Sequence, residues 1–424
     1  MTERGKNVIL YTINKHSRKE SYMKTVGIVC EYNPFHTGHG RQLDILRENG
    51  AEVIICAMSG NFSERGEMTI ADKYTRAESA IKCGADVVVE LPFPYSSLSA
   101  EGFASAGVHI LAGLGCDTLS FGSECADKEL LTRAADVILS DDFVRDYAER
   151  SKSQGTAKSY FDLLSSYLGG DTTLLSNDIL AISYFAAIKR DGLNMDIFPI
   201  KREGAAYTSS QLGDSYPSAT AIRKAVKNSS DGFFSVSDKH IPRETLTVLQ
   251  NAQKNDIAPV FMGSIGSEIL SFFKLMSPED IILRAKKKSG GGEAVCCDGC
   301  GIVERLCNCA KTAPDFDKFV ASAYNSRYTD ARINRVILFS LIGASDIFEK
   351  SLPEYTILLA SSENGRKHLS NIRKTGEFPI ITKPADAPEG KPTDILRLSD
   401  SLYISAFTKS ISFDYFIKKH PFMG

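Results

Sequence analysis

The sequence predicts an α/β fold in which a doubly wound parallel-sheet domain precedes a mainly helical domain. Short, continuously apolar runs recur in the first half of the chain, and segments compatible with helices separate them. Beyond about residue 235 the periodicity is helical, with few strand signals. The 424 residues, 43% of them hydrophobic, are enough for two or three domains, each with its own core.

Four apolar runs in the first half are predicted strands. They are TVGIVCEY, AEVIICAMS, DVVVELP and CDTLSFGSE, at residues 25–32, 51–59, 86–92 and 116–124. Residues 38–48, 71–84 and 100–115 lie between them and are compatible with helices. Strands that are apolar throughout are typical of a parallel sheet covered on both faces. We therefore expect one doubly wound domain at residues 23–235.

The two ends of the chain differ from this pattern. Residues 1–22 are polar and carry no sustained period, so we expect a flexible N-terminal extension, or a translation start at Met23 instead of Met1. Residues 236–424 are expected to form the mainly helical domain. Near its end, EYTILLASS and FPIITK look like strands, and SDSLYISAFTKS looks like a helix.

Charge, hydropathy and cysteine content narrow the classes of function. The formal net charge of −2 excludes a globally basic nucleic-acid binder, although a local basic patch remains possible. No apolar run approaches the roughly 18 residues needed to cross a bilayer, so no membrane partner is expected. The ten cysteines come without a signal peptide, which favours free thiols in the cytoplasm.

The stretch GIVCEYNPFHTGH, at residues 27–39, places two histidines directly after the first predicted strand. In doubly wound sheets, ligands bind in the loops that lead from strands into helices. A helix N-terminus suits a phosphate, and imidazoles beside it can donate hydrogen bonds and stabilise a leaving pyrophosphate. His36 and His39 are therefore candidate catalytic residues. The His-x-x-His spacing by itself also fits a metal site or chance.

The motif His36-Thr37-Gly38-His39 resembles the (H/T)xGH signature of the nucleotidyltransferase superfamily. A longer series of blocks resembles the bacterial tRNA(Met) cytidine acetate ligase family. From Met23 to about Lys227 these blocks keep the family's order: GIVCEYNPFHTGH, MSGNFSERGE, KYTRAESAIKCGADVVVELPF, FGSE, SNDILAISYFAAI, IKREGAAY and SATAIRKA. The resemblance implies a Rossmann-like nucleotidyltransferase fold for the first domain.

The same resemblance implies a two-step reaction. Acetate would attack the α-phosphate of ATP to give acetyl-adenylate and pyrophosphate. The acetyl group would then pass to the exocyclic amine of the wobble cytidine in elongator tRNA(Met), forming N4-acetylcytidine. ATP is thus expected as a substrate together with Mg²⁺, with no firmly bound cofactor, and tRNA(Met) and acetate are the expected partners.

The resemblance also implies a set of ATP-binding residues. Gly122 would let the nucleotide approach closely, the Asn177 amide can read a base or ribose edge although Ser176 replaces the family's proline, and Arg202 offers a planar charge to phosphate. Ser218 and Thr220 fit helix N-caps equally well. The full set is Val29, Cys30, Glu31, Tyr32, Asn33, Pro34, Phe35, His36, Thr37, Gly38, His39, Gly40, Arg41, Gln42, Gly122, Asn177, Arg202, Ser218, Thr220 and Arg223.

The block SRYTDARINRVILFSL in the second domain brings Arg327, Arg332 and Arg335 close together in the sequence. It resembles a basic block of the family that is thought to touch tRNA, which implies phosphate contacts that position the RNA. A solvated helix face is the alternative. The i, i+4 spacing of Asp72, Lys73 and Arg76 likewise favours a solvated stripe, unless Lys73 and Arg76 face the nucleotide.

Four cysteines have spacings that could suit a metal. Cys297 and Cys300 form C-x-x-C, and Cys307 and Cys309 form C-x-C, which together are enough ligands for zinc. The family's corresponding block has no cysteine requirement. We therefore expect no metal site, with zinc as the alternative.

Two other functions stay open at this point. One is a nucleotidyltransferase that adenylylates a small phosphorylated substrate, and the other is a catalytically silent RNA-binding Rossmann protein. A second domain with clustered arginines argues against the first alternative, and paired histidines argue against the second. Neither the acyl-donor selectivity nor the oligomeric state can be read from the chain.

Overall fold

The structure is a computed structural model that describes residues 24–150, 156–170, 174–202, 218–289, 301–324, 328–345, 348, 350–375 and 378–424. The expected N-terminal extension at residues 1–22 lies outside them. In the part that is described, no helix is long and apolar enough to cross a membrane.

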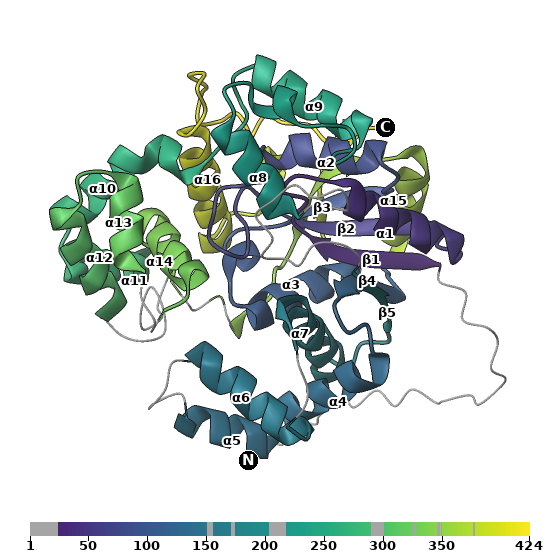
Figure 1. Ribbon diagram of the computed structural model, residues 1–424. Coiled ribbons are helices and arrows are strands. Elements are labelled where there is room, and N and C mark those ends of the chain that lie inside the picture. Colours follow the sequence, from purple (N-terminus) through teal and green to yellow (C-terminus); the bar gives the residue numbers. More distant parts are fainter. Residues whose placement is uncertain are drawn as a thin grey trace, which may run out of the picture.

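One mixed sheet is the centre of the fold (Figure 1). The described strands run in the order β5-β4-β1-β2-β3-β6-β7, and β8 pairs with β6. Strands β1 to β5 are parallel to one another, whereas β6 pairs antiparallel with β3. The strands are β1 (Thr25–Cys30), β2 (Val53–Ser59), β3 (Val87–Leu91), β4 (Thr118–Ser123), β5 (Asp196–Lys201), β6 (Thr356–Ser361), β7 (Ile380–Ile381) and β8 (Phe422–Met423).

Helices cover the sheet and extend beyond it (Figure 1). In the first half they are α1 (Thr37–Glu48), α2 (Lys73–Lys82), α3 (Ala100–Gly113), α4 (Lys128–Leu139), α5 (Asp141–Arg150), α6 (Thr156–Leu168), α7 (Ser176–Arg190) and α8 (Ala219–Asn228). The later ones are α9 (Arg243–Lys254), α10 (Gly266–Leu275), α11 (Pro278–Ser289), α12 (Gly301–Thr312), α13 (Phe316–Ala323), α14 (Asp330–Ile342), α15 (Glu363–Thr375) and α16 (Lys391–Ile404).

The four predicted strands correspond to β1, β2, β3 and β4, within two residues at either end. Their side chains are buried almost throughout, as expected for a sheet covered on both faces. Close packing uses a glycine in β1, because a Cβ at Gly27 would lie 2.8 Å from a Leu111 methyl group of α3. The expected α/β fold with a predominantly parallel sheet is confirmed.

The sheet also takes strands from the C-terminal stretch. The two strands expected near residues 354–362 and 378–383 are β6 and β7, and β6 extends the central sheet beyond β3. Strand β5, which follows α7, had no strand prediction. The predicted domain boundary between residues 235 and 236 stays a prediction. Residues 356–423, however, contribute strands to the same sheet as β1 to β5.

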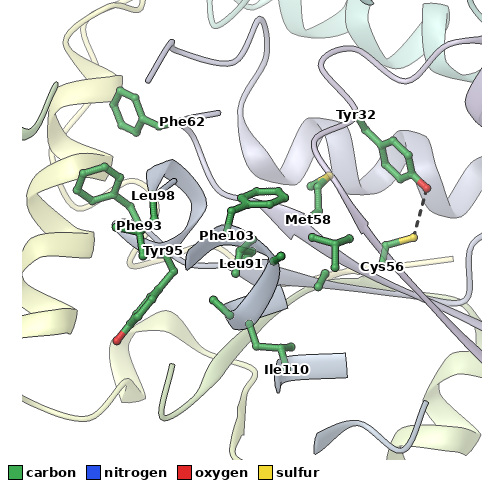
Figure 2. Packing of buried hydrophobic residues seen from close by; sticks show 14 of the residues in the cluster. Tyr32, Cys56, Met58, Phe62, Leu91, Phe93, Tyr95, Leu98, Phe103 and Ile110 are labelled. Atoms are coloured by element: carbon green, nitrogen blue, oxygen red, sulfur yellow. Dashed lines mark hydrogen bonds between the residues drawn. The ribbon is translucent and has the colours of Figure 1, made fainter. Parts of the chain in front are cut away.

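A continuous apolar core joins the sheet to the helical cluster α10–α14. Figure 2 shows Phe93 and Phe62 near the end of β3, with Leu91 and Phe103 packed beside them. The Phe93 ring meets Phe339 of α14 edge-on, with their centroids 5.5 Å apart. The helical cluster is therefore packed directly against the end of the sheet where the strand-to-helix loops gather.

Candidate active site

A cavity of about 300 Å³ lies at the carboxyl ends of β1, β4 and β5. Doubly wound sheets bind ligands at this edge. Sixteen of the residues expected to bind ATP line the cavity: Val29, Cys30, Glu31, Tyr32, Asn33, His36, Gly38, His39, Arg41, Gln42, Gly122, Asn177, Arg202, Ser218, Thr220 and Arg223. Residues far apart in the sequence are thus brought together as expected. Their individual roles stay predictions.

Pro34, Phe35, Thr37 and Gly40 are not among the cavity-lining residues. Phe35 is buried and packs its ring against Tyr32 and His39, at centroid distances of 4.8 and 5.5 Å. The Thr37 hydroxyl and backbone N–H both donate to the carbonyl of His240. Phe35 and Thr37 thus hold this segment in place from outside the cavity.

The two histidines are stacked at the N-terminus of α1, with ring centroids 3.7 Å apart. His36 is the N-cap, and its Nδ1 accepts from the Gly38 N–H at 3.1 Å. The Nδ1 of His39 accepts from the His36 N–H at 3.2 Å. Because each Nδ1 is an acceptor, a neutral ring carries its proton on Nε2. Each imidazole therefore offers one N–H donor.

Both imidazoles are held in the neutral form at pH 7. Burial, followed by the positive charge of Arg202, lowers the pKa of His36 to about 3. Burial, then the charges of His36 and Arg202, lowers the pKa of His39 well below its ordinary value. The histidines can thus supply hydrogen bonds to an anion, while the positive charge in the cavity comes from Lys201 and the arginines Arg41, Arg202 and Arg223.

Tyr32 and Asn33 turn the chain from β1 into this loop. Tyr32 has a φ of 46°, and its buried hydroxyl lies 3.5 Å from the Cys56 sulfur (Figure 2). The Asn33 side-chain carbonyl accepts from the Ile70 N–H at 2.7 Å. Within the described residues, the buried Asn33 Nδ2 has no hydrogen-bond partner. Asn33 lines the cavity, whereas its Nδ2 atom is buried beneath the cavity surface.

Arg223 of α8 is fixed against the same loop. Its guanidinium donates to the backbone carbonyl of Asn33 at 2.9 Å and to the Thr220 hydroxyl at 3.3 Å. It also lies 3.6 Å from the Glu67 carboxylate. Ser218 caps α8 by accepting from the Ala221 N–H. Helix capping was the alternative role that we expected for Ser218, and the residue also lines the cavity.

Gly122 and Arg202 face each other across the β4–β5 pair. A Cβ at Gly122 would lie 3.2 Å from Cγ of Arg202, so the missing side chain leaves room for the arginine stem. The sequence predicted that the nucleotide approaches Gly122 closely. The structure shows that the Arg202 side chain also occupies the space beside this glycine.

Two acidic residues that position this edge were missed from the sequence. The buried Asp178 accepts from the Ser123 hydroxyl at 2.6 Å and from the N–H groups of Glu124 and Cys125. Burial raises the pKa of Asp178, but the hydrogen bonds outweigh it and hold that pKa below the ordinary value. Glu124 in turn accepts from the Asn177 amide. The aspartate directly after Asn177, in the first turn of a helix, was the available signal.

The solvated stripe expected at Asp72, Lys73 and Arg76 is wrong. All three are buried, with 1% exposure, and none lines the cavity. Asp72 caps α2, Lys73 pairs with Glu90 and Asp400, and Arg76 donates to backbone carbonyls that include Ser59. These charges hold the fold together at the edge of the site.

The basic block is only partly described, because Arg327 lies outside the described residues. The Arg332 guanidinium lies over the Tyr328 ring, 5.6 Å from its centroid. Arg335 pairs with Glu64, which lines the cavity.

The cysteine set is also only partly described, since Cys297 and Cys300 lie outside the described residues. Cys307 is buried and Cys309 is half-buried, and both are free thiols. Across the described ranges, His, Cys, Asp and Glu form no group of three or more that could hold a metal ion.

A family model described as HIGH nucleotidyl transferase matches residues 23–415. The tRNA(Met) cytidine acetate ligase of Caldanaerobacter subterraneus subsp. tengcongensis is 33% identical to this chain, covering 86% of this chain and 89% of that protein. The ligase of the same name from Syntrophotalea carbinolica is 34% identical, covering 85% of each. The structure of Thermotoga maritima TmcAL bound with alpha-thio ATP has a TM-score of 0.81 and 29% identity, covering 95% of this chain and 99% of that one.

Proposed function

Because the chain belongs to the HIGH nucleotidyl transferase family, we propose that it activates acetate with ATP and acetylates the wobble cytidine of elongator tRNA(Met). The names of the relatives support the ligase reaction, and the solved TmcAL with an ATP analogue supports a nucleotide in the cavity. The observation that carries the proposal is the stacked pair His36 and His39, with Arg202 beside it, at a helix N-terminus.

In the first step, an acetate oxygen would attack the α-phosphorus of ATP. A P–O bond to acetate forms, and the P–O bond to pyrophosphate breaks. Acetate is already an anion and a competent nucleophile, so the protein has to supply positioning and charge stabilisation. The Nε2–H groups of His36 and His39, the guanidinium of Arg202 and the N-terminus of α1 are suited to the charge on the leaving group.

In the second step, the exocyclic amine of cytidine would attack the acetyl carbonyl of acetyl-adenylate. The new C–N bond forms as the C–O bond to AMP breaks, and the amine loses one proton.

Magnesium is proposed to enter on the triphosphate of ATP. Mg²⁺ keeps several waters and is commonly bound through substrate phosphates with few protein ligands.

Binding of tRNA(Met) is proposed on the helical side of the cavity. The α10–α14 cluster lies beside the sheet edge that carries the site (Figure 1). A wobble base splayed out of its loop would have to reach the adenylate from outside the cavity. Arg327, Arg332 and Arg335 are the residues predicted to contact RNA phosphates.

The test is ATP–pyrophosphate exchange with acetate, with propionate and with no acid, followed by nucleoside analysis of total tRNA after incubation. We expect acetate-dependent exchange and N4-acetylcytidine in tRNA(Met). Exchange that requires a phosphorylated small molecule would favour the adenylyltransferase alternative. ATP-independent RNA binding without exchange would favour the silent binder, and either result would overturn the proposal.

A further inference from the structure

Glu64 and Arg335 join the cavity wall to the helical cluster. Nη1 of Arg335, on α14, lies 2.9 Å from a carboxylate oxygen of Glu64 and 3.3 Å from its backbone carbonyl. The two residues are 271 positions apart in the sequence. Glu64 lines the cavity, and its backbone N–H donates to the carboxylate of Glu31 at 2.8 Å. Arg335 thus holds both the backbone carbonyl and the side-chain carboxylate of Glu64, a residue that lines the proposed nucleotide site.

The loop that carries Glu64 is seated directly on the α14 backbone. Gly66 has a φ of +72°, and a Cβ there would lie 2.4 Å from the backbone nitrogen of Arg335. The loop closes on itself, because the Ser63 N–H donates to the Glu67 carbonyl at 2.9 Å. This close approach keeps the Arg335 guanidinium directed at the cavity wall. The residue is therefore poorly placed to contact RNA phosphates.

The charge of this pair matters because ATP and acetate are both anions. The cavity wall contains two carboxylates, Glu31 and Glu64, among its described residues. Burial raises the pKa of Glu64, and the charge of Glu31 raises it further. The positive charges of Arg335 and Arg65 lower it, but the net shift is upward. A carboxylate without its counter-charge at this position would repel anionic ligands.

We propose that Arg335 is a positioning residue of the nucleotide cavity, which neutralises Glu64 and thereby keeps this wall compatible with anionic substrates. The inference rests on the proposed function and revises the role of one residue of the basic block. It also ties acetate activation to α14, a helix of the segment expected to bind RNA.

A rescue experiment tests this role. Arg335→Ala should raise the KM for acetate and the Kd for ATP by about tenfold, with a smaller change in kcat, because one charge is left uncompensated. Glu64→Gln in the Arg335→Ala background should restore most of the affinity, since the repelling charge is gone. Arg335→Lys keeps the positive charge and should retain most of the affinity. Arg373→Ala, an exposed change on α15, is the matched control and should leave both constants unchanged.

The pH dependence gives an independent readout. The groups that face Glu64 are Arg335, Glu31 and Arg65. Without Arg335 the pKa of Glu64 rises further, so its charge appears only as the pH increases. The defect of Arg335→Ala should therefore grow as the pH rises and should be independent of pH in the double variant.

Three results would overturn the inference. One is a folded Arg335→Ala variant whose loss is not relieved by Glu64→Gln, and another is normal exchange and ATP affinity with weakened tRNA binding. The third is equal loss in the Lys and Ala variants. If the wild type shows no acetate-dependent exchange, the proposed function fails, and equilibrium titration with ATP in the same four variants still decides the role of the pair.

Discussion

The ammonium group of Lys73 lies 2.8 Å from a carboxylate oxygen of Asp400, a residue 327 positions further along the chain. The same ammonium lies 2.8 Å from Glu90, and the Asn61 amide also donates to Asp400 at 2.8 Å. Lys73 and Glu90 are almost completely buried. This cluster joins α2, β3 and α16, and so fixes the C-terminal helix to the sheet.

Replacing Lys73 with Met should destabilise the fold strongly. The change leaves Glu90 and Asp400 buried without a cation, and breaking a buried pair in this way costs about 3–5 kcal/mol. Urea unfolding measures the loss. Lys367→Met removes an exposed i, i+4 pair with Glu363 and should cost under about 1 kcal/mol. Equal losses in the two variants would contradict the importance of the buried cluster.

Glu90 should make stability depend on pH. Burial raises the pKa of Glu90 from 4.5 to about 7, although Lys73 opposes the rise. Between these two values the native carboxyl holds a proton that the unfolded chain has lost, so the free energy of unfolding falls as the pH rises. The contribution is complete below about pH 4.5 and is lost above about pH 7.

Glu90→Gln removes this titration. The free energy of unfolding of the wild type minus that of the variant should therefore fall by on the order of 3 kcal/mol between pH 4.5 and 7. Urea titrations of both proteins across this range measure it. A difference that does not change with pH would show that folding leaves the pKa of Glu90 unshifted.

Replacing His36 or His39 with Ala should lower the rate of acetate-dependent exchange by roughly 10²-fold or more, the effect of losing one preorganised donor. His368→Ala on α15, outside the cavity-lining set, is the control. Because the pKa of His36 is lowered to about 3, the wild-type exchange rate should show no inflection from this residue near pH 6.5. Near wild-type exchange in a folded His36→Ala variant would remove the residue from the mechanism.

Arg202→Lys should weaken ATP binding by about tenfold, because lysine keeps the charge but loses the planar fork that matches phosphate. Calorimetric titration with ATP measures the change. Arg145→Lys, at an exposed position on α5, should bind ATP as the wild type does. Unchanged affinity in Arg202→Lys would mean that the guanidinium does not contact the phosphates.

The sequence alone determined the features that depend on neighbouring residues. The apolar runs predicted β1 to β4 because a strand buried on both faces needs no distant partner to be recognised. The loop between β1 and α1 could be placed at the sheet edge because the strand, the turn residues and the next helix follow one another directly in the sequence. Even the histidine pair is local, since His36 and His39 cap the same helix turn.

The tertiary structure decided the features that depend on residues far apart in the chain. The i, i+4 spacing on α2 favoured a solvated stripe, yet Lys73 is buried because its partners come from β3 and α16. The basic block gave no sign that Arg335 turns inward, because its partner Glu64 lies on a loop after β2. The sequence predicted the strand that becomes β6, but its antiparallel pairing with β3 is visible only in the folded structure. A charge in the sequence has no fixed environment until the chain brings its counter-charge into contact, so spacing predicts the elements better than it predicts which charges they bury.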